Sequence, residues 1–371
     1  MRRTFDALAV PAAVWLAATA TVLATAAERG YAPLAPATWK RWDSGLYLWI
    51  AQDGYWLGAP CRGQAGYCGG NTGWFPGYPW LVRLAHDDLG LAYTTAGVCV
   101  SWTFGLATLV LLWVTFLGRR RSAPAIGALA FAAFSPGAVY RYAVFPLSVL
   151  AFCTVAYLWL LHRRRWLPAG VAGGLAAVTY PTAAALAAVG AAWGLATARA
   201  DSRPRRLARA LLAGGLPACG TALAFAVMDR DVGRWDAYFL AQRKYHHHLQ
   251  APLMPAVHAL GVLIHRPLGS ASAATAFQTL LVTVVLVTLV WAAARGRPLA
   301  GPDGLLLLWA VVAWVAANVE SGVSTYRAEA TLLPLALLVR RLPVPLVGAF
   351  TAAAAAVVVW TTALFLDLTL L

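Results

Sequence analysis

Charged side chains are scarce in this sequence, and acidic ones are the scarcest. Only 12% of the 371 residues are charged, with 14 aspartates and glutamates against 29 lysines and arginines. A soluble domain usually carries about a quarter charged residues. Together with an apolar fraction of 61%, this composition excludes an ordinary soluble protein and favours a membrane protein.

The motifs of several common enzyme classes are missing as well. The sequence has no P-loop, no Rossmann glycine signature, no GxSxG nucleophile elbow and no zinc-protease motif. Nothing in it therefore implies a soluble nucleotide or another cofactor. It also has no low-complexity tract, no extended soluble domain and no clear internal repeat.

Long apolar runs take up much of the chain. Five of them hold about 20 residues each, enough to cross a hydrocarbon core of about 30 Å. They are Ala7–Ala27, Thr95–Leu117, Ala210–Met228, Thr275–Ala294 and Val344–Leu366. The first resembles a signal peptide, but it is long and no convincing cleavage site follows it, so we interpret it as a first helix. We expect residues 1–371 to form a single polytopic membrane domain.

Basic residues gather in short clusters that each abut an apolar run. The clusters are Arg2–Arg3, Arg119–Arg121, Arg163–Arg165, Arg199 to Arg209, Arg295 with Arg297, and Arg340–Arg341. This is the positive-inside pattern, with the clusters in the cytoplasm. Nucleic-acid binding would instead favour basic residues on one folded face. We therefore expect no nucleic-acid partner, despite the net charge of +15.

Placing every cluster in the cytoplasm predicts an all-α bundle of about 11 transmembrane helices. Two long connections, residues 28–94 and 229–274, then lie on the extracytoplasmic side. Two tight helical pairs have short legs, which fits half-helices broken at Pro136 and Pro181 and buried in protein.

The acidic residues and the cysteines agree with this topology. Eleven of the 14 acids fall outside or at that interface, and the exceptions are Asp6, Asp201 and Asp303. The carboxylates available for chemistry therefore lie on the extracytoplasmic face. Cys61 and Cys68 lie in the first outside connection, where oxidation is permitted, which predicts a local disulfide. Three others are interpreted as packing residues within helices: Cys99, Cys153 and Cys219.

The first outside connection carries an aromatic stripe. Its members recur at helical spacing: Trp39, Trp42, Leu46, Trp49 and Ile50. The spacing predicts an amphipathic helix in the membrane interface, with its tryptophans at headgroup depth. Asp43 lies beside the stripe. Asp53 follows roughly 280° around the helix, so the two carboxylates would not share a face.

Two interpretations of Asp43 stand side by side. Asp43 or Ser44 can cap a helix that begins there, by accepting bonds from its free N–H groups. Alternatively, the Asp43 carboxylate is a general base that deprotonates an acceptor hydroxyl as it attacks an anomeric carbon. Lys40 and Arg41 beside it can bind a lipid phosphate or snorkel to anionic headgroups.

A larger set of residues in this connection keeps the order and spacing of a known motif. The set is Arg41-Trp42-Asp43-Ser44, Tyr47, Ile50-Ala51, Gly54-Tyr55, Phe75-Pro76, Tyr78-Pro79 and Arg83. With these residues the segment resembles the first luminal loop of the GT-C glycosyltransferase superfamily. In particular it is similar to the PIG-V-like family, whose eukaryotic members add the second mannose of the GPI anchor.

The resemblance implies a GT-C-like first extracytoplasmic loop with interfacial helices. It also implies a polyprenyl- or dolichyl-phosphate sugar donor, usually of mannose, and an inverting single displacement. The catalytic aspartate of the family falls on Asp43. On the same ground we expect Arg41, Trp42, Tyr47 and Tyr78 to bind substrate, and Lys40 joins them because of its charge beside Asp43.

Outside this connection the resemblance is looser. Ser135-Pro136 matches a Ser-Pro element, but the acidic residue expected several positions later is missing. Thr179-Tyr180-Pro181 stands where the family tends to have Thr-Arg-Pro. Tyr326-Arg327, with Pro334 downstream, resembles the late Arg-Tyr and Phe-Pro region. These departures concern the acceptor and the sugar rather than the motif around Asp43.

The second outside connection contains three adjacent histidines, within the run from Gln242 to His248. Neighbouring side chains on a strand point to opposite faces, and zinc ligands are usually spaced by two or more residues. We therefore expect no metal site. Gln242, Lys244 and His246 either line the sugar or acceptor cleft or belong to a solvated loop with an interfacial helix.

Arg327 lies where a late helix meets the outside face, between Glu320 and Glu329. Charges at this depth are costly and often functional, and an arginine fork suits a lipid phosphate. The alternative is a structural salt bridge to one of the two glutamates. Arg141 is a similar candidate for binding a phosphate.

These features favour a glycosyltransferase in the cell membrane, with its site on the extracytoplasmic face. It would move a sugar from a polyprenyl-phosphate donor to a lipid, glycan or protein acceptor. We also expect membrane lipids among its binding partners. The main alternative is a transporter or flippase for lipids or lipid-linked sugars, which midplane charges and internal symmetry would favour. A scaffold without catalysis would leave the clustering of Trp, Asp, Tyr and Pro in one connection unexplained.

Overall fold

The structure is a computed structural model that describes residues 2–63, 65–197, 202–295, 301–320 and 324–370. Helices dominate these ranges, and one two-stranded sheet accompanies them. Three residues that we place on the cytoplasmic side lie outside the described part: Arg199, Asp201 and Arg297. The side chain of Tyr326, part of the late motif, lies outside it too.

Five helical stretches of the described chain are long and apolar enough to cross a membrane. They are α1 (Arg2–Glu28), α4 (Tyr93–Thr115), the continuous α9–η4–α10, α13 (Ala271–Arg295) and α16 (Val344–Leu366). In the third, the π-helix η4 (Leu211–Gly215) joins α9 (Arg203–Ala210) to α10 (Leu216–Val232). All five coincide with the apolar runs of the sequence, which confirms those segments as helices.

Shorter apolar helices fill the space between them: α5 (Ala123–Ala133), α6 (Leu147–His162), α7 (Trp166–Thr179), α8 (Ala185–Ala196), α12 (Met254–His265) and α14 (Pro302–Asn318). The 3₁₀-helices η2 (Ala138–Arg141) and η3 (Pro181–Ala184) separate α5 from α6 and α7 from α8. The breaks expected at Pro136 and Pro181 are therefore confirmed, because the residue before a proline disfavours helical geometry. The number of about 11 crossings stays a prediction based on the charge pattern.

The late segment η6 (Glu329–Arg341) is a buried 3₁₀-helix rather than an α-helix. It contains Pro334, which has no N–H and cannot continue an α-helical ladder. A 3₁₀-helix rises about 2.0 Å per residue, so 13 residues reach about 26 Å, as far as a longer α-helix would. This geometry lets a short segment run from one end of the bundle towards the other.

Close helix packing in the bundle depends on small residues. A Cβ added to Gly220 of α10 would lie 2.3 Å from the carbonyl oxygen of Gly174 in α7. One added to Gly173 would lie 2.7 Å from the ring of Tyr157 in α6. Such contacts between backbones are typical of helix pairs in membranes, and they hold α6, α7 and α10 against one another.

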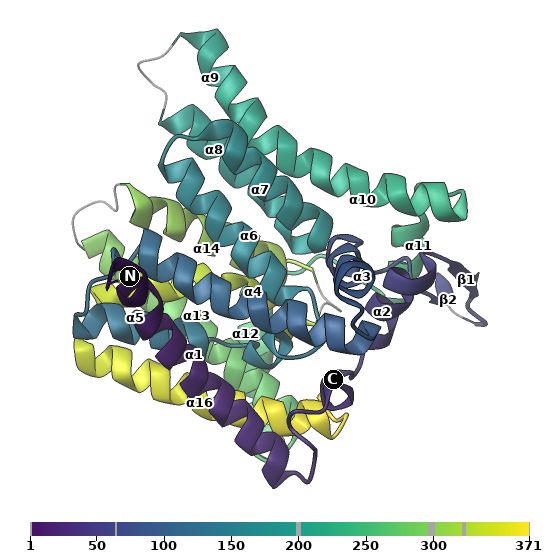
Figure 1. The fold of residues 1–371 in the computed structure, drawn as a ribbon, viewed down its shortest axis with the longest axis horizontal. Helices are drawn as coiled ribbons and strands as arrows, with labels where there is room; N and C mark the ends of the chain where they lie inside the picture. The colour runs from purple at the N-terminus through teal and green to yellow at the C-terminus, as the bar shows by residue number, and fades with distance from the viewer. Residues whose placement is uncertain (1, 64, 198–201, 296–300, 321–323, 371) are drawn as a thin grey trace.

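The first connection, residues 28–94, folds into several short elements at one end of the bundle. They are η1 (Pro36–Trp39), α2 (Ser44–Asp53), the antiparallel strands β1 (Leu57–Pro60) and β2 (Tyr67–Gly70), and α3 (Gly77–Leu89). The strands pair Leu57 with Gly70, and a disulfide links Cys61 to Cys68, as the sequence predicts. Figure 1 shows α2, α3, the hairpin and α11 gathered at the same end.

The expected continuous amphipathic helix in this connection is wrong. The chain leaves helical geometry between η1 and α2, where Trp42 has a positive φ of 54°. Trp39 is fully buried and donates its indole N–H to the Pro33 carbonyl at 2.8 Å. Trp49 on α2 is exposed. The aromatic stripe is therefore divided between the core and the surface.

The second and third connections pack on the first. The second, residues 229–274, contains α11 (Ala237–Gln242), η5 (Arg243–Tyr245) and α12, and the third, residues 319–328, contains α15 (Thr325–Ala328). The Thr72 hydroxyl donates to the Ala237 carbonyl at 3.1 Å, and the Gln250 N–H donates to the Val319 carbonyl at 2.8 Å. Three segments far apart in the sequence thus meet at one end of the helices.

Candidate active site

Asp43 lies in the turn directly before α2. Its carbonyl oxygen accepts the N–H groups of Leu46 and Tyr47 at 2.9 and 3.3 Å. Its carboxylate makes no capping hydrogen bond, and the Ser44 hydroxyl accepts the N–H of Arg41 at 3.2 Å instead of one from the helix. The cap interpretation of the Asp43 side chain is therefore wrong, and the carboxylate is directed to another partner.

That partner is Arg327 on α15. Its Nη1 donates to Oδ2 of Asp43 in an ion pair, and its Nη2 donates to the Ser324 hydroxyl at 2.8 Å. The two side chains are 24% and 23% exposed, so a substrate can reach both. The structure thus joins two residues that the sequence singled out separately.

The glutamates considered as partners of Arg327 have other contacts. Glu329 is buried and accepts from Nε2 of Gln278 at 2.7 Å. Glu320 lies 3.8 Å from Nδ1 of His247. The salt bridge of Arg327 is therefore made with the first connection and not with either glutamate.

Trp42 helps to fix the turn that carries Asp43. A positive φ is costly for a bulky residue and persists only where the surroundings impose it. Here the indole N–H of Trp42 donates to the Phe365 carbonyl at 3.2 Å, near the end of α16. The C-terminal helix therefore anchors the turn on the side opposite to α2.

Two buried tyrosines pack beneath the turn. Tyr47 and Tyr78 are buried and meet edge to face with ring centroids 5.7 Å apart. The Tyr78 hydroxyl donates to the Gly97 carbonyl at 2.8 Å, so it is tied to α4. Burial raises the pKa of Tyr47 well above its usual range, and the nearby Tyr180 and Asp43 add smaller contributions in the same direction. Both rings therefore pack as neutral groups beneath the ion pair.

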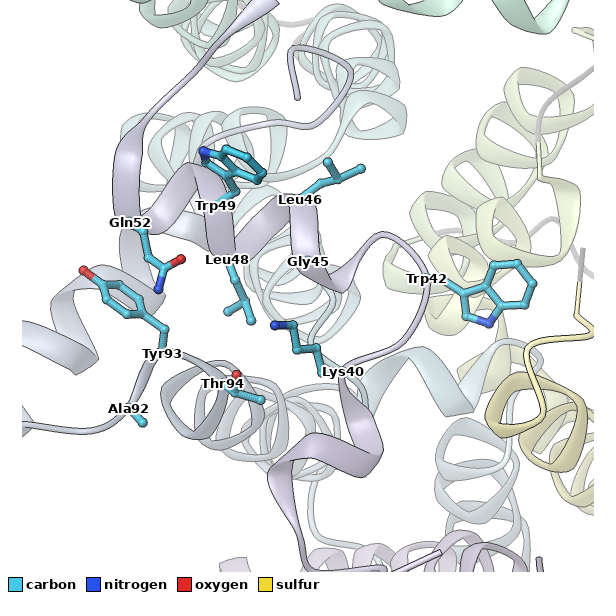
Figure 2. Close-up of a pocket in the computed structure, with 10 residues that line it drawn as sticks. All are labelled: Lys40, Trp42, Gly45, Leu46, Leu48, Trp49, Gln52, Ala92, Tyr93 and Thr94. Atoms are coloured by element: carbon cyan, nitrogen blue, oxygen red, sulfur yellow. The ribbon is translucent and has the colours of Figure 1, made fainter. Parts of the chain in front are cut away.

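A half-open groove of about 660 Å³ lies next to the turn. Its lining comes from the turn, from α2 and from the start of α4: Lys40, Trp42, Gly45, Leu46, Leu48, Trp49, Gln52, Ala92, Tyr93 and Thr94. Figure 2 shows the Lys40 amino group and the Gln52 amide on the side of Tyr93, with Trp49 above them. Neither Asp43 nor Arg327 is among these lining residues, but Asp43 lies between Trp42 and Gly45 in the sequence, so the groove borders the turn that carries the ion pair.

Arg41 points to a different neighbourhood from Lys40. Its guanidinium lies 5.2 Å from the centre of the Tyr31 ring, and its Nη1 donates to the Ala37 carbonyl at 3.4 Å. These contacts fix the entry to the turn. The structure therefore places Lys40 at the groove and Arg41 behind it.

Gln242 joins the second connection to the first. Its amide nitrogen donates to the Gly73 carbonyl at 3.4 Å, and its amide oxygen lies 3.3 Å from Nε2 of His247. Lys244 lies over the ring of Tyr245, and His246 is exposed in a left-handed conformation. Gln242 thus joins two connections, and none of Gln242, Lys244 and His246 is among the residues that line the groove. Among the described residues, no group of three His, Cys, Asp or Glu side chains could hold a metal ion.

Other residues that the sequence singled out have structural contacts. Arg141 is buried and donates to the carbonyls of Ala132 and Ala133 at 3.2 and 2.6 Å, where α5 ends. It thereby satisfies carbonyls that a helix end leaves without partners. Thr179 packs so closely on α3 that a Cβ at Gly77 would lie 2.6 Å from its hydroxyl.

The sequence did not identify several residues of the site. Ser324, which bonds to Arg327, carries no motif that could have marked it. Gln52 lies near the middle of the first connection and Tyr93 at its end, and the two meet only through the packing of α2 on α4. For Tyr180 the sequence offered one signal, because tyrosine stands there in place of the arginine that the PIG-V-like family tends to have. In the structure Tyr180 acts electrostatically on Tyr47.

No family model matches the sequence, and no curated protein matches it. Two solved structures share its fold. ArnT from Cupriavidus metallidurans, bound to undecaprenyl phosphate, has a TM-score of 0.53 at 14% identity, over 90% of this chain and 59% of its own. The archaeal oligosaccharyltransferase AglB from Archaeoglobus fulgidus, in complex with an inhibitory peptide and a dolichol-phosphate, has a TM-score of 0.52 at 12% identity, over 97% of this chain and 56% of its own.

The chain therefore shares the arrangement of helices of these two structures. It spans less than two thirds of the length of either structure. At such low identity the likeness concerns the arrangement of helices and not the chemistry.

Proposed function

We propose that this chain is a GT-C glycosyltransferase of the membrane, of the inverting type, that uses a polyprenyl-phosphate sugar donor. The observation that carries the proposal is the ion pair between Asp43 and Arg327 beside an open groove. It joins a proton acceptor to a phosphate-binding group, the two functions that such a transfer needs. The motif around Asp43 favours a PIG-V-like enzyme and mannose as the sugar.

In this reaction Asp43 acts as the general base. Its carboxylate takes the proton of an acceptor hydroxyl while the hydroxyl oxygen forms a bond to the anomeric carbon. The bond from that carbon to the donor phosphate oxygen breaks in the same step, and its electron pair leaves with the lipid phosphate. Attack from the side opposite to the leaving group inverts the anomeric centre.

Arg327 binds the phosphate of the donor in this scheme. Its guanidinium has several N–H donors and suits a phosphate in a bidentate arrangement. A phosphate that arrives at Arg327 competes with Asp43 for these donors, so donor binding makes the carboxylate available to the acceptor. Arg327 thereby links donor binding to the activation of the base.

The other residues have supporting roles. Lys40 and Trp42 contact substrate in the groove, where an ammonium group and aromatic faces suit a phosphorylated sugar. Gln242, Lys244 and His246 contribute from the second connection, on the acceptor side. Arg41, Tyr47 and Tyr78 bind substrate only through the positions that they give to the turn.

The proposed site faces the extracytoplasmic side of the cell membrane. The disulfide between Cys61 and Cys68 lies in the same connection as Asp43, and disulfides persist in oxidising compartments. The positive-inside pattern places the same connection outside. The donor would then be presented from the outer leaflet.

The direct test is a transfer assay on membranes or purified protein with polyprenyl-phosphate mannose labelled in the sugar. Transferase activity moves the label to an acceptor and releases unglycosylated lipid phosphate. A flippase without transferase activity would move the intact donor across vesicles and release none. The same assay with a glucose-bearing donor separates a mannosyltransferase from another hexosyltransferase.

A further inference from the structure

A second pocket, of about 500 Å³, lies at the other end of the bundle. It lies where α4 ends, α5 and α14 begin and η6 ends, and its lining is Thr115, Phe116, Leu117, Gly118, Arg120, Ser122, Pro124, Ala125, Asp303, Arg340 and Arg341. The groove beside Asp43 is at the start of α4 and this pocket is at its end. The 23 residues of α4 separate the two by about 34 Å, so the pocket is distinct from the candidate active site.

The charges that line this pocket are mainly positive. Arg340 and Arg341 both donate to Asp303, which is 3% exposed, while the two arginines themselves are partly exposed. One carboxylate balances one of these arginines, and Arg120 adds a further positive charge from the turn after α4. The pocket therefore carries an excess of positive charge and draws its arginines from two distant parts of the chain.

The N-terminus of α5 adds to this positive character. Its first residues line the pocket, its N-cap Ser122 makes no side-chain capping bond, and no acid lies in its first turn. The neighbouring helix α14, in contrast, has Asp303 in its first turn. Free N–H groups and the helix dipole attract anions to a helix N-terminus. The α5 terminus and the arginines thus converge on the same space.

The wall of the pocket is apolar on one side. Phe116 and Pro124 are partly exposed beside the arginines, whereas the lining residues Leu117 and Ala125 are buried; all four lie near the end of a helix that is apolar enough to span a membrane. A soluble anion would gain nothing from this wall. A phosphate attached to acyl chains would bury them along it, and basic pockets between helices on the cytoplasmic side are known to hold lipid headgroups.

We propose that this pocket binds the phosphate of an anionic phospholipid, at the cytoplasmic end of the bundle. Arg120 and the arginines of η6 hold the phosphate together with the N–H groups of Ala123 and Ala125 at the start of α5, where Pro124 has none. The apolar part of the wall receives the start of the acyl chains. The lipid would fasten the turn between α4 and α5 to the end of η6. The proposal is independent of the reaction at Asp43.

Binding is measured on the purified full chain in a neutral detergent, by native mass spectrometry during titration with phosphatidylglycerol. The informative variant is Arg120→Gln, because Arg120 is exposed and outside the cluster around Asp303. The matched control is Arg205→Gln, which removes an exposed charge from the basic cluster on α9, a helix that packs on α8 and η4. A basic residue at a membrane surface contributes about 1 kcal/mol to lipid binding, so Arg120→Gln should weaken binding about fivefold. Arg205→Gln should leave it unchanged.

Two further ligands separate a lipid from a free phosphate. Phosphatidylcholine, whose headgroup is zwitterionic, should bind more weakly than phosphatidylglycerol, and glycerol phosphate should bind more weakly still. Equal losses in the two arginine variants would mean general attraction to a basic surface and would overturn the proposal. Glycerol phosphate binding as tightly as the lipid would overturn it as well, because the site would then be one for a soluble anion.

Discussion

Arg327 and Asp43 are 284 residues apart in the sequence and form an ion pair in the folded chain. The pair joins the third connection to the turn before α2, beside the groove that Lys40 and Trp42 line. Both side chains are partly exposed and neither caps a helix. The same two residues therefore carry the two sharpest predictions about the activity.

Replacement of Asp43 by asparagine should abolish most of the turnover and leave the fold intact. Asparagine keeps the shape and an oxygen that can accept from Arg327, but its amide cannot take a proton from the acceptor. A general base supplies about 10²–10⁴-fold, so turnover should fall by at least about a hundredfold in the labelled-donor assay. Thermal stability should stay near that of the native chain, because the Asp43 side chain makes no capping bond.

Asp53→Asn is the matched control for this change. Asp53 lies on the same helix and is exposed, so its loss should leave turnover near native. A well-folded Asp43→Asn variant with near-native turnover would refute the catalytic role of Asp43.

Arg327→Lys should mainly raise the KM for the donor. Lysine keeps the charge but cannot hold a phosphate with two parallel N–H groups. A hydrogen bond to a charged group contributes about 1.5–3 kcal/mol, so the KM should rise roughly tenfold or more. The control is Arg29→Lys, which alters the exposed ion pair with Asp367 on the same end of the bundle. An unchanged donor KM together with a lower protein yield would point to a purely structural role for Arg327.

The two tryptophans that flank the turn should respond differently to truncation. Trp39→Ala removes a fully buried indole and should lower the free energy of unfolding by about 3–5 kcal/mol. Trp49→Ala removes an exposed ring that lines the groove and should raise a substrate KM up to about tenfold, with stability nearly unchanged.

Trp80→Ala serves as the control for Trp49→Ala. Trp80 is similarly exposed on α3 but does not line the groove. If both variants change the KM to the same extent, the groove does not bind substrate. The change in KM would then arise because either tryptophan helps to hold the first connection at the membrane surface.

Labelling of single cysteines with a membrane-impermeant maleimide tests the orientation of the chain. Leu34→Cys and Leu249→Cys lie at exposed positions of the first and second connections and should react on intact cells. Arg163→Cys should react only after permeabilisation, since its cluster is predicted to be cytoplasmic. The background lacks the free cysteines Cys99, Cys153 and Cys219. The reverse pattern would place Asp43 in the cytoplasm and remove the proposed mechanism.

Local patterns in the sequence anticipated the elements that depend on local physics. The five apolar runs are helices, because a long uncharged segment satisfies its backbone hydrogen bonds only within itself in a bilayer. The breaks near Pro136 and Pro181 follow from proline geometry. The disulfide between Cys61 and Cys68 joins residues that are only seven positions apart.

The expected stripe from Trp39 to Ile50 failed for a physical reason. The helical spacing of the aromatic residues is compatible with one continuous helix. The spacing of side chains carries no information about a residue whose backbone is forced to a positive φ. Trp42 adopts that conformation where its indole is held by the Phe365 carbonyl, more than 300 positions later. The break therefore depends on how α16 packs, which no window of local sequence contains.

The sequence by itself determined that this is a helical membrane protein with an acidic residue of interest at position 43, because composition, hydrophobic length and a short motif are local properties. Only the tertiary structure decided the partner of that residue. Glu320 and Glu329 are closer to Arg327 in the sequence, yet Arg327 reaches Asp43. The bundle brings the first and third connections together, and the energy of an ion pair depends on distance in space rather than on separation along the chain.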